Sequence, residues 1–182
     1  MRQGSVVVFD GQSLNNRPFT GAFPALVMAR HPRRAWLNCA IGGLSWTNLA
    51  VSVAARTRYA CSPWERRIGV LTGGYSDILG GDSGATAHAD MVAYAAAAGF
   101  THTIACTMTH GVDTTGAEQG RIDAFNELVR GYGWDGVADF AASPILSDPS
   151  NATYFVDGLH WTAAGAEEAA DILDPVLAPL LI

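Results

Sequence analysis

The sequence predicts an α/β protein: a three-layer α/β/α sandwich around a parallel sheet of about five strands in flavodoxin-like order. Short β-rich runs alternate with longer helical patterns along the whole chain, and no linker, charge block or repeat interrupts them. Consecutive parallel strands need crossover connections, which are right-handed and place helices on both faces of the sheet. The 182 residues are therefore expected to form one domain, 1–182, that folds around its own core without a disulfide or a metal.

Each expected element follows from its apolar pattern and from the residues that bound it. Residues 5–9 form a continuous apolar run, which is typical of a strand covered on both faces. Further strands are expected at 35–41, 67–72, 102–108 and 136–140. Helices are expected at 20–31, 46–59, 86–98, 116–132 and 163–173; Pro32 and Pro175 mark the ends of the first and last, and Gly99 closes the third.

The composition excludes several classes of protein. Hydrophobic residues make up 49% of the chain and charged residues 15%, which is unlike a disordered protein. The net charge is −6, and the densest basic stretch, 30–34, is too short for a nucleic-acid-binding stripe. No apolar run reaches the roughly 18 residues that span a bilayer, and the first residues lack the pattern of a secretory signal. A cytoplasmic location is therefore expected, with export by another route left open.

The three cysteines do not indicate a metal site. Cys39, Cys61 and Cys106 form no C-x-x-C pair and have no ligand spacing with a histidine, so a structural zinc ion is not expected. They are expected to be buried or partly buried thiols in a reducing compartment. A single Cys39–Cys61 bridge remains open as the alternative.

Two short motifs contain residues that could act in catalysis. Both lie at the carboxyl edge of the predicted sheet, which is the edge at which such folds bind ligands. Ser13 comes two residues after Gly11, directly behind the first strand, so a tight turn could expose its hydroxyl. Asp157 and His160 are three residues apart, just before the last helix. At that spacing the carboxylate can orient the imidazole as a general base. The plain alternatives are an ordinary strand-end turn and an Asp helix cap beside an exposed histidine.

Together, and in this order, Ser13, Asp157 and His160 resemble the SGNH hydrolases, which are also called GDSL-type esterases. The resemblance implies that Ser13 is the nucleophile, His160 the general base and Asp157 the anion that orients it. It also implies an oxyanion hole formed by the backbone N–H groups of Ser13 and Gly43, with Gly42 as the alternative register.

Two positions depart from the common pattern of that family. The segment Gly74-Tyr75-Ser76-Asp77 matches a Gly-x-Asn-Asp block, so Ser76 stands where the family has asparagine and becomes the third candidate oxyanion donor. Because one lost donor can reduce the rate by about 100- to 1,000-fold, this change leaves open a catalytically weakened, glycan-binding module. The Gly-Gln-Ser form at Gln12 resembles that of carbohydrate acetylesterases in the same superfamily.

The expected function is therefore hydrolysis of carboxylic esters through an acyl-enzyme, on short acyl esters or acetylated carbohydrates. The expected partner is a small-molecule or glycan ester, with no nucleic acid, no cofactor and no metal. Asn15, His110 and Trp161 lie close to the motifs or the predicted crevice and are candidate substrate contacts. Ser83, although it lies in a Gly-Asp-Ser string, is expected to cap a helix. The remaining histidines, His31, His88 and His102, are expected to face solvent.

Overall fold

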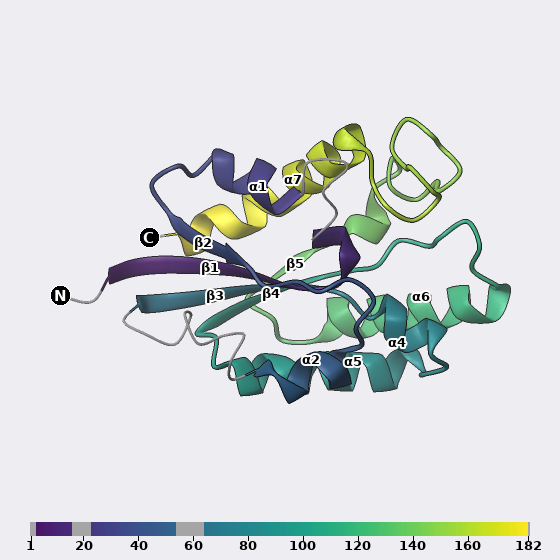
Figure 1. The fold of residues 1–182 in the computed structure, drawn as a ribbon, viewed down its shortest axis with the longest axis horizontal. Helices are drawn as coiled ribbons and strands as arrows, with labels where there is room; N and C mark the ends of the chain where they lie inside the picture. Colours follow the sequence, from purple (N-terminus) through teal and green to yellow (C-terminus); the bar gives the residue numbers. More distant parts are fainter. Residues whose placement is uncertain (1–2, 16–22, 54–63, 182) are drawn as a thin grey trace.

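The computed structural model describes residues 3–15, 23–53 and 64–181, and its centre is a five-stranded sheet (Figure 1). The strands are β1 (Gln3–Gly11), β2 (Ala35–Asn38), β3 (Trp64–Thr72), β4 (His102–Cys106) and β5 (Gly136–Ala138). All neighbouring pairs are parallel, and the order is β2-β1-β3-β4-β5. This is the flavodoxin-like order that the sequence predicts.

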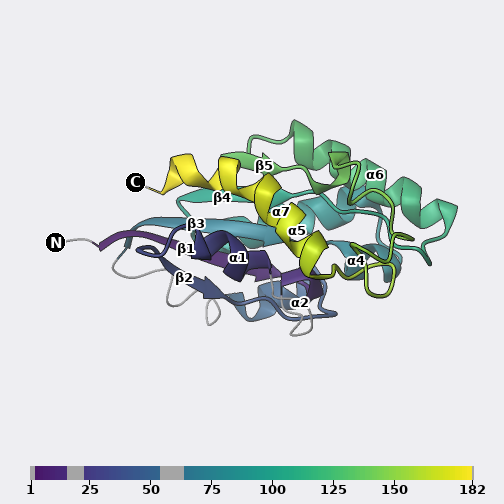
Figure 2. The ribbon, with the colours of Figure 1, turned by 90° about the horizontal axis from the view of Figure 1, so that it is seen from above.

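Helices cover both faces of the sheet (Figures 1 and 2). On one face, α1 (Phe23–Ala29) and α7 (Ala163–Leu177) pack side by side. The other face carries α2 (Trp46–Val51), α4 (Tyr75–Leu79), α5 (Gly84–Ala98) and α6 (Gly116–Gly131). Three short 3-10 turns complete the elements: η1 (Ser13–Asn15), η2 (Phe140–Ala142) and η3 (Ala178–Leu180). Among the described residues, no helix combines the length and the apolar character needed to cross a bilayer.

Two apolar cores lie between the sheet and its helix layers. Successive side chains of a strand point to opposite faces, so a strand that is apolar throughout fills both cores. Val70 packs toward α1 and α7, whereas its neighbour Leu71 packs toward α2, α5 and α6, and both are fully buried. This arrangement explains why the first strand is a continuous apolar run rather than an alternating one.

Local signals account for most helix boundaries. Ser83 caps α5 by accepting the Thr86 N–H, as predicted, and Gly99 closes the helix with φ +70°. The expected end of the last helix at residue 173 is wrong, because α7 continues through Pro175 to Leu177. Proline removes one backbone donor from a helix. Here the final turn is maintained because the Leu177 side chain is fully buried in the core.

The sequence pattern misses one helix and misplaces some strand ends. A loop is expected after β3, but this segment contains α4, which begins after Gly74. β3 also starts at Trp64, three residues before its expected start, and β4 ends at Cys106, before the expected residue 108. The expected start of the first helix and end of the second, at 20–22 and 54–59, lie outside the described residues, as does Cys61. The Cys39–Cys61 bridge therefore stays a prediction.

His88 is buried, which corrects the expectation that it faces solvent. Its ring on α5 lies against Phe125, Tyr132 and Trp134, and only 8% of the residue is exposed. Burial lowers the pKa of the imidazole, because removing it from water disfavours the charged form. The His88 ring therefore takes up a proton more readily in the unfolded chain than in the folded one.

We expect this difference to make the protein less stable on acidification. Above the unfolded pKa of about 6.5, His88 is neutral in both states and contributes no pH dependence. Below that value only the unfolded state gains the proton, so the free energy of unfolding decreases until the folded-state pKa is passed. Urea unfolding at about pH 7.5 and about pH 5.5 measures the decrease. His88→Gln should show a smaller decrease than wild type; an equal decrease in the two proteins would contradict the assignment.

Candidate active site

The chain turns sharply at the end of β1, and this turn presents Ser13 at the carboxyl edge of the sheet. Gly11 has φ +129°, and a Cβ at this position would overlap the carbonyl group of Thr72 on β3, so glycine is required here. The buried Asp10 carboxylate accepts hydrogen bonds from the Gly11 N–H and the Tyr94 hydroxyl. The next peptide is held as well, because the Gln12 N–H donates to the Thr72 carbonyl at 2.9 Å.

The loop before α7 presents the second motif. The Asp157 carboxylate accepts the backbone N–H groups of Leu159 (3.2 Å) and His160 (2.8 Å), which closes a tight turn. The same carboxylate lies 2.8 Å from Nδ1 of the His160 ring. Thr162 then caps α7 by accepting the Gly165 N–H. One short segment thus supplies the imidazole, its orienting carboxylate and the rigid helix that holds both.

The fold brings the two motifs together. Ser13 Oγ lies 2.8 Å from Nε2 of His160, although the two residues are 147 positions apart in the chain. The Asp157 carboxylate can only accept a hydrogen bond, so the proton on the ring is placed at Nδ1 and Nε2 accepts from the Ser13 hydroxyl. The His160 side chain is 11% exposed, which leaves the pair shielded but reachable. The three groups form one continuous hydrogen-bonded chain.

The electrostatics fit this arrangement. Partial burial of Asp157 raises its pKa, but the hydrogen bonds from the His160 N–H, the His160 ring and the Leu159 N–H outweigh burial, so its pKa lies below the usual range. The carboxylate is therefore charged at neutral pH and stabilises a positive charge on the ring. Cys106, by contrast, is fully buried, and burial raises the pKa of its thiol to about 12. It is not a competing nucleophile.

Three hydrogen-bond donors border the space next to Ser13. Within the described part of the chain, no group accepts from the backbone N–H of Ser13 or of Gly43, although both residues line the same cavity. Gly42 does not line it, which favours the Gly43 register. The Ser76 N–H is engaged by Gln12 at 3.2 Å, so the hydroxyl is the donor that Ser76 can offer. Ser13, Gly43 and Ser76 thus line one cavity, and their role as an oxyanion hole stays a prediction.

Two adjacent hollows meet at this point. The first, of about 190 Å³, is mostly apolar and is lined by residues that include Ser13, Leu14, Gly43, Ser76, Met108 and Leu159. The second is a shallower depression of about 450 Å³, which His160 lines together with the carboxylates of Asp113, Glu118 and Asp157. Tyr75, Leu79 and Leu159 line both hollows, so they stand between them. An ester bound at Ser13 would therefore meet an apolar space on one side and a polar one on the other.

The three weaker candidates do not lie in either hollow. Asn15 is fully buried, and its amide donates to the Asp10 carbonyl at 3.0 Å, so it supports the turn from within. Trp161 is 3% exposed and packs edge-on against Phe23 and Phe140 in the core. The His110 ring lies 2.8 Å from Asp123 on α6 and lines neither hollow. Trp161 therefore belongs to the core between the sheet and the layer of α1 and α7.

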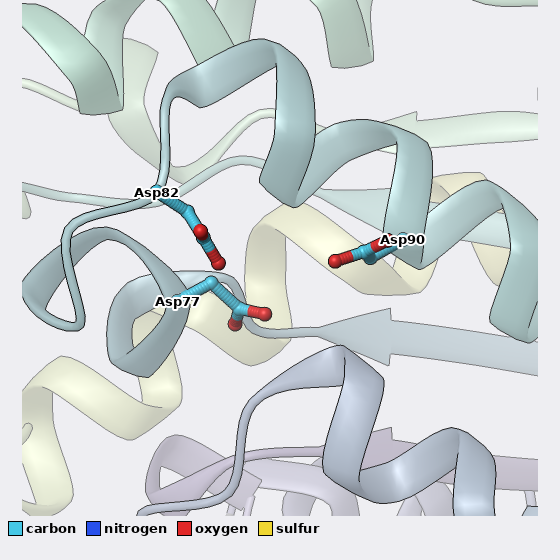
Figure 3. Close-up of side chains that lie close together, drawn as sticks. All are labelled: Asp77, Asp82 and Asp90. Carbon is cyan, nitrogen blue, oxygen red and sulfur yellow. The ribbon is translucent and has the colours of Figure 1, made fainter.

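A group of three carboxylates lies on α4, on α5 and on the turn between them (Figure 3). Asp77, Asp82 and Asp90 place carboxylate oxygens within 4.8 Å of one another. The most buried of them, Asp77, is already hydrogen-bonded to the Trp46 N–H and to the Gln12 amide. Asp77 thus ties α4 to Gln12 and to the start of α2, while the proximity of Asp82 and Asp90 was not visible in the sequence.

Comparisons with known proteins bear on this geometry. No protein-family model matches the chain, and a search of curated proteins gives no significant match. Solved structures do match. A member of the lipolytic protein G-D-S-L family from Veillonella parvula has a TM-score of 0.79 at 17% identity and covers 97% of this chain and 99% of its own. The lipase/acylhydrolase from Enterococcus faecalis has a TM-score of 0.74 at 14% identity and covers 99% and 98%.

A third solved structure, that of an esterase, also matches this chain. The psychrotrophic esterase from Pseudoalteromonas sp., determined in a form inhibited by monoethylphosphonate, has a TM-score of 0.70 at 12% identity and covers 97% of this chain and 98% of its own. At identities this low, the structural matches establish the architecture alone. They do so over nearly the full length of each chain. The predicted fold is thus confirmed: this chain has the fold of the SGNH, or G-D-S-L, hydrolases.

Proposed function

We propose that the chain is a serine esterase of the SGNH type, with Ser13 as nucleophile, His160 as general base and Asp157 as the orienting anion. The observation that carries the proposal is the continuous hydrogen-bonded chain from Ser13 Oγ through the His160 ring to Asp157, at 2.8 Å for each link. Likeness of fold to proteins described as lipolytic, acylhydrolase and esterase supports it. Fold alone does not fix an activity, so the local geometry is the stronger argument.

The chemistry follows from the positions of the donors and acceptors. Ser13 attacks the ester carbonyl while Nε2 of His160 takes its proton, and Asp157 stabilises the imidazolium. The N–H groups of Ser13 and Gly43 and the hydroxyl of Ser76 hold the negative oxygen of the tetrahedral intermediate. His160 next protonates the departing alcohol. Water repeats the sequence on the acyl-enzyme and releases the acid, and the resting triad is restored.

The proposed substrates are esters of short acyl groups, including acetyl groups on carbohydrates. The apolar cavity beside Ser13 measures about 190 Å³, below the roughly 300–1,000 Å³ of pockets for drug-sized ligands, which favours a short acyl chain. The depression beside His160 is larger and carries several carboxylate oxygens, which can accept hydrogen bonds from hydroxyl groups of the alcohol. The Gly-Gln-Ser form of the nucleophile turn agrees with this substrate class.

Covalent labelling tests the assignment directly. A fluorophosphonate probe should label the wild-type protein at one serine, and Ser13→Ala should abolish both labelling and hydrolysis of p-nitrophenyl acetate. Ser83→Ala is the matched control, because Ser83 caps α5 and lies in the Gly-Asp-Ser string without touching either hollow. Labelling that survives in Ser13→Ala would overturn the nucleophile assignment.

The same experiment separates the esterase from the glycan-binding alternative. A folded wild-type protein that neither reacts with the probe nor hydrolyses the ester would favour a binding module on this scaffold. If the protein is active, a panel of esters that varies acyl length and sugar acetylation tests the substrate class. We expect acetyl and propionyl esters to have a higher kcat/KM than long-chain esters.

A further inference from the structure

Gln12 occupies an unusual position between the strand and the nucleophile. It follows the last residue of β1 and precedes Ser13, yet only 4% of it is exposed. Its side chain is buried, and a buried amide must find partners for both its oxygen and its nitrogen. These partners lie in the loop that carries Gly43 and in the first turn of α4.

The amide of Gln12 makes three hydrogen bonds. Its nitrogen donates to the Leu44 carbonyl at 2.7 Å and to Asp77 Oδ2 at 3.2 Å. Its oxygen accepts the Ser76 N–H at 3.2 Å. Two acceptors on one side and one donor on the other define which end of the amide is nitrogen. One side chain thus links the Ser13 turn to the loop of Gly43 and to the first turn of α4, which carries Ser76.

Asp77 completes the link. It is 1% exposed, and its second oxygen accepts the Trp46 N–H at 2.9 Å. Gln12 therefore holds the loop that carries Gly43 at Leu44, and Asp77 holds the start of α2, which follows that loop, at Trp46. Among the described residues, no other side chain is hydrogen-bonded both to the Gly43 loop and to α4.

We infer that Gln12 is a positioning residue that sets the spacing of the three oxyanion donors, acting through the Leu44 carbonyl and through Ser76 and Asp77. The inference rests on the proposed function, because it gives those donors a task. A carboxylate or an apolar side chain at position 12 could not do the same. A carboxylate keeps the acceptor for the Ser76 N–H but has no N–H for Leu44 or Asp77, and it places a second negative charge beside Asp77.

Gln12→Glu tests this with almost no change in size. We expect kcat for p-nitrophenyl acetate to fall by about 100-fold at neutral pH, since misplaced donors stabilise the transition state less. KM should change little, because the walls of the apolar cavity remain. Gln119→Glu is the matched control: Gln119 on α6 also donates its amide N–H to a backbone carbonyl, that of Thr114, and the variant should retain wild-type kcat.

The pH profile of Gln12→Glu gives a readout that a general loss of stability would not produce. The introduced carboxylate would face Asp77 on α4, and Asp82 and Asp90 lie just beyond (Figure 3). Arg121 on α6 donates to the carbonyl of Gly81, the residue before Asp82. Two carboxylates at one site share a proton readily, and a protonated carboxyl group at position 12 regains a donor. The ratio of variant to wild-type kcat should therefore rise as the pH is lowered.

A neutral variant covers the case in which the glutamate variant does not fold. Gln12→Met keeps the length without any hydrogen bond, so its kcat should be low at every pH and its ratio to wild type flat. A kcat within about twofold of wild type for a folded Gln12→Glu or Gln12→Met would overturn the inference. Wild-type and Ser13→Ala proteins in the same assay report on the proposed function separately: an inactive wild type removes both proposals, whereas an active one leaves only Gln12 in question.

Discussion

Replacing His160 by alanine is expected to reduce kcat by about four to six orders of magnitude while the protein stays folded. The Ser13 hydroxyl then loses the base that it contacts in the described part of the chain, Nε2 of His160 at 2.8 Å. Members of a triad act as a unit, so the loss of one removes almost all of their joint effect. The backbone N–H groups of the cavity would remain and should leave a residual rate above the uncatalysed one.

Steady-state kinetics with p-nitrophenyl acetate, together with circular dichroism, would measure this effect. His110→Ala is the control, because that ring pairs with Asp123 and lines neither hollow. It should keep wild-type kcat. A decrease of less than about tenfold in His160→Ala would show that another group activates Ser13, and the esterase mechanism proposed above would be wrong.

The second large effect is expected for Gly11→Ala, in both stability and activity. The new Cβ would lie 2.7 Å from the carbonyl carbon of Thr72 and would overlap its oxygen, and φ +129° is itself unfavourable for alanine. Together the clash and the strain should lower the free energy of unfolding by about 3 kcal/mol. Relief of the clash requires β1 and β3 to separate at their ends, which moves Ser13 away from His160.

Urea unfolding and kcat measured on the folded fraction would test both parts. Gly120→Ala is the matched control: Gly120 lies on the exposed side of α6, and a Cβ there meets nothing within 4 Å. Because alanine is the better helix former, that variant should be more stable than wild type by about 0.5–1 kcal/mol, with unchanged activity. Wild-type stability in Gly11→Ala would mean that the turn after β1 can relax without cost.

The sequence was sufficient for the layers, the strand order and the two motifs, for identifiable physical reasons. Buried parallel strands are apolar on both faces, so runs such as residues 5–9 stand out, and right-handed crossovers leave few arrangements of five strands. The Ser13 and His160 motifs were visible because each depends on a short local turn. The carboxyl edge of a parallel sheet then determines where such turns meet.

The remaining features depend on contacts between distant segments. Nothing near Gln12 in the chain indicates that its amide reaches Leu44 and Asp77, because those partners are 32 and 65 residues away. Burial of His88 depends on α6 packing against α5, which a weakly patterned, Ala-rich segment does not reveal. Trp161 was a candidate substrate contact only because it adjoins His160. Its side chain instead packs into the core, against Phe23 and Phe140.

The distance of 147 residues between Ser13 and His160 has a consequence for the timing of synthesis. The turn that carries Ser13 is synthesised before the segment of Asp157 and His160, which lies just ahead of α7. Until α7 docks beside α1, a nascent chain has a serine with no partner to withdraw its proton. Since domains fold as units during translation, the proposed triad would assemble only after α7 has been synthesised.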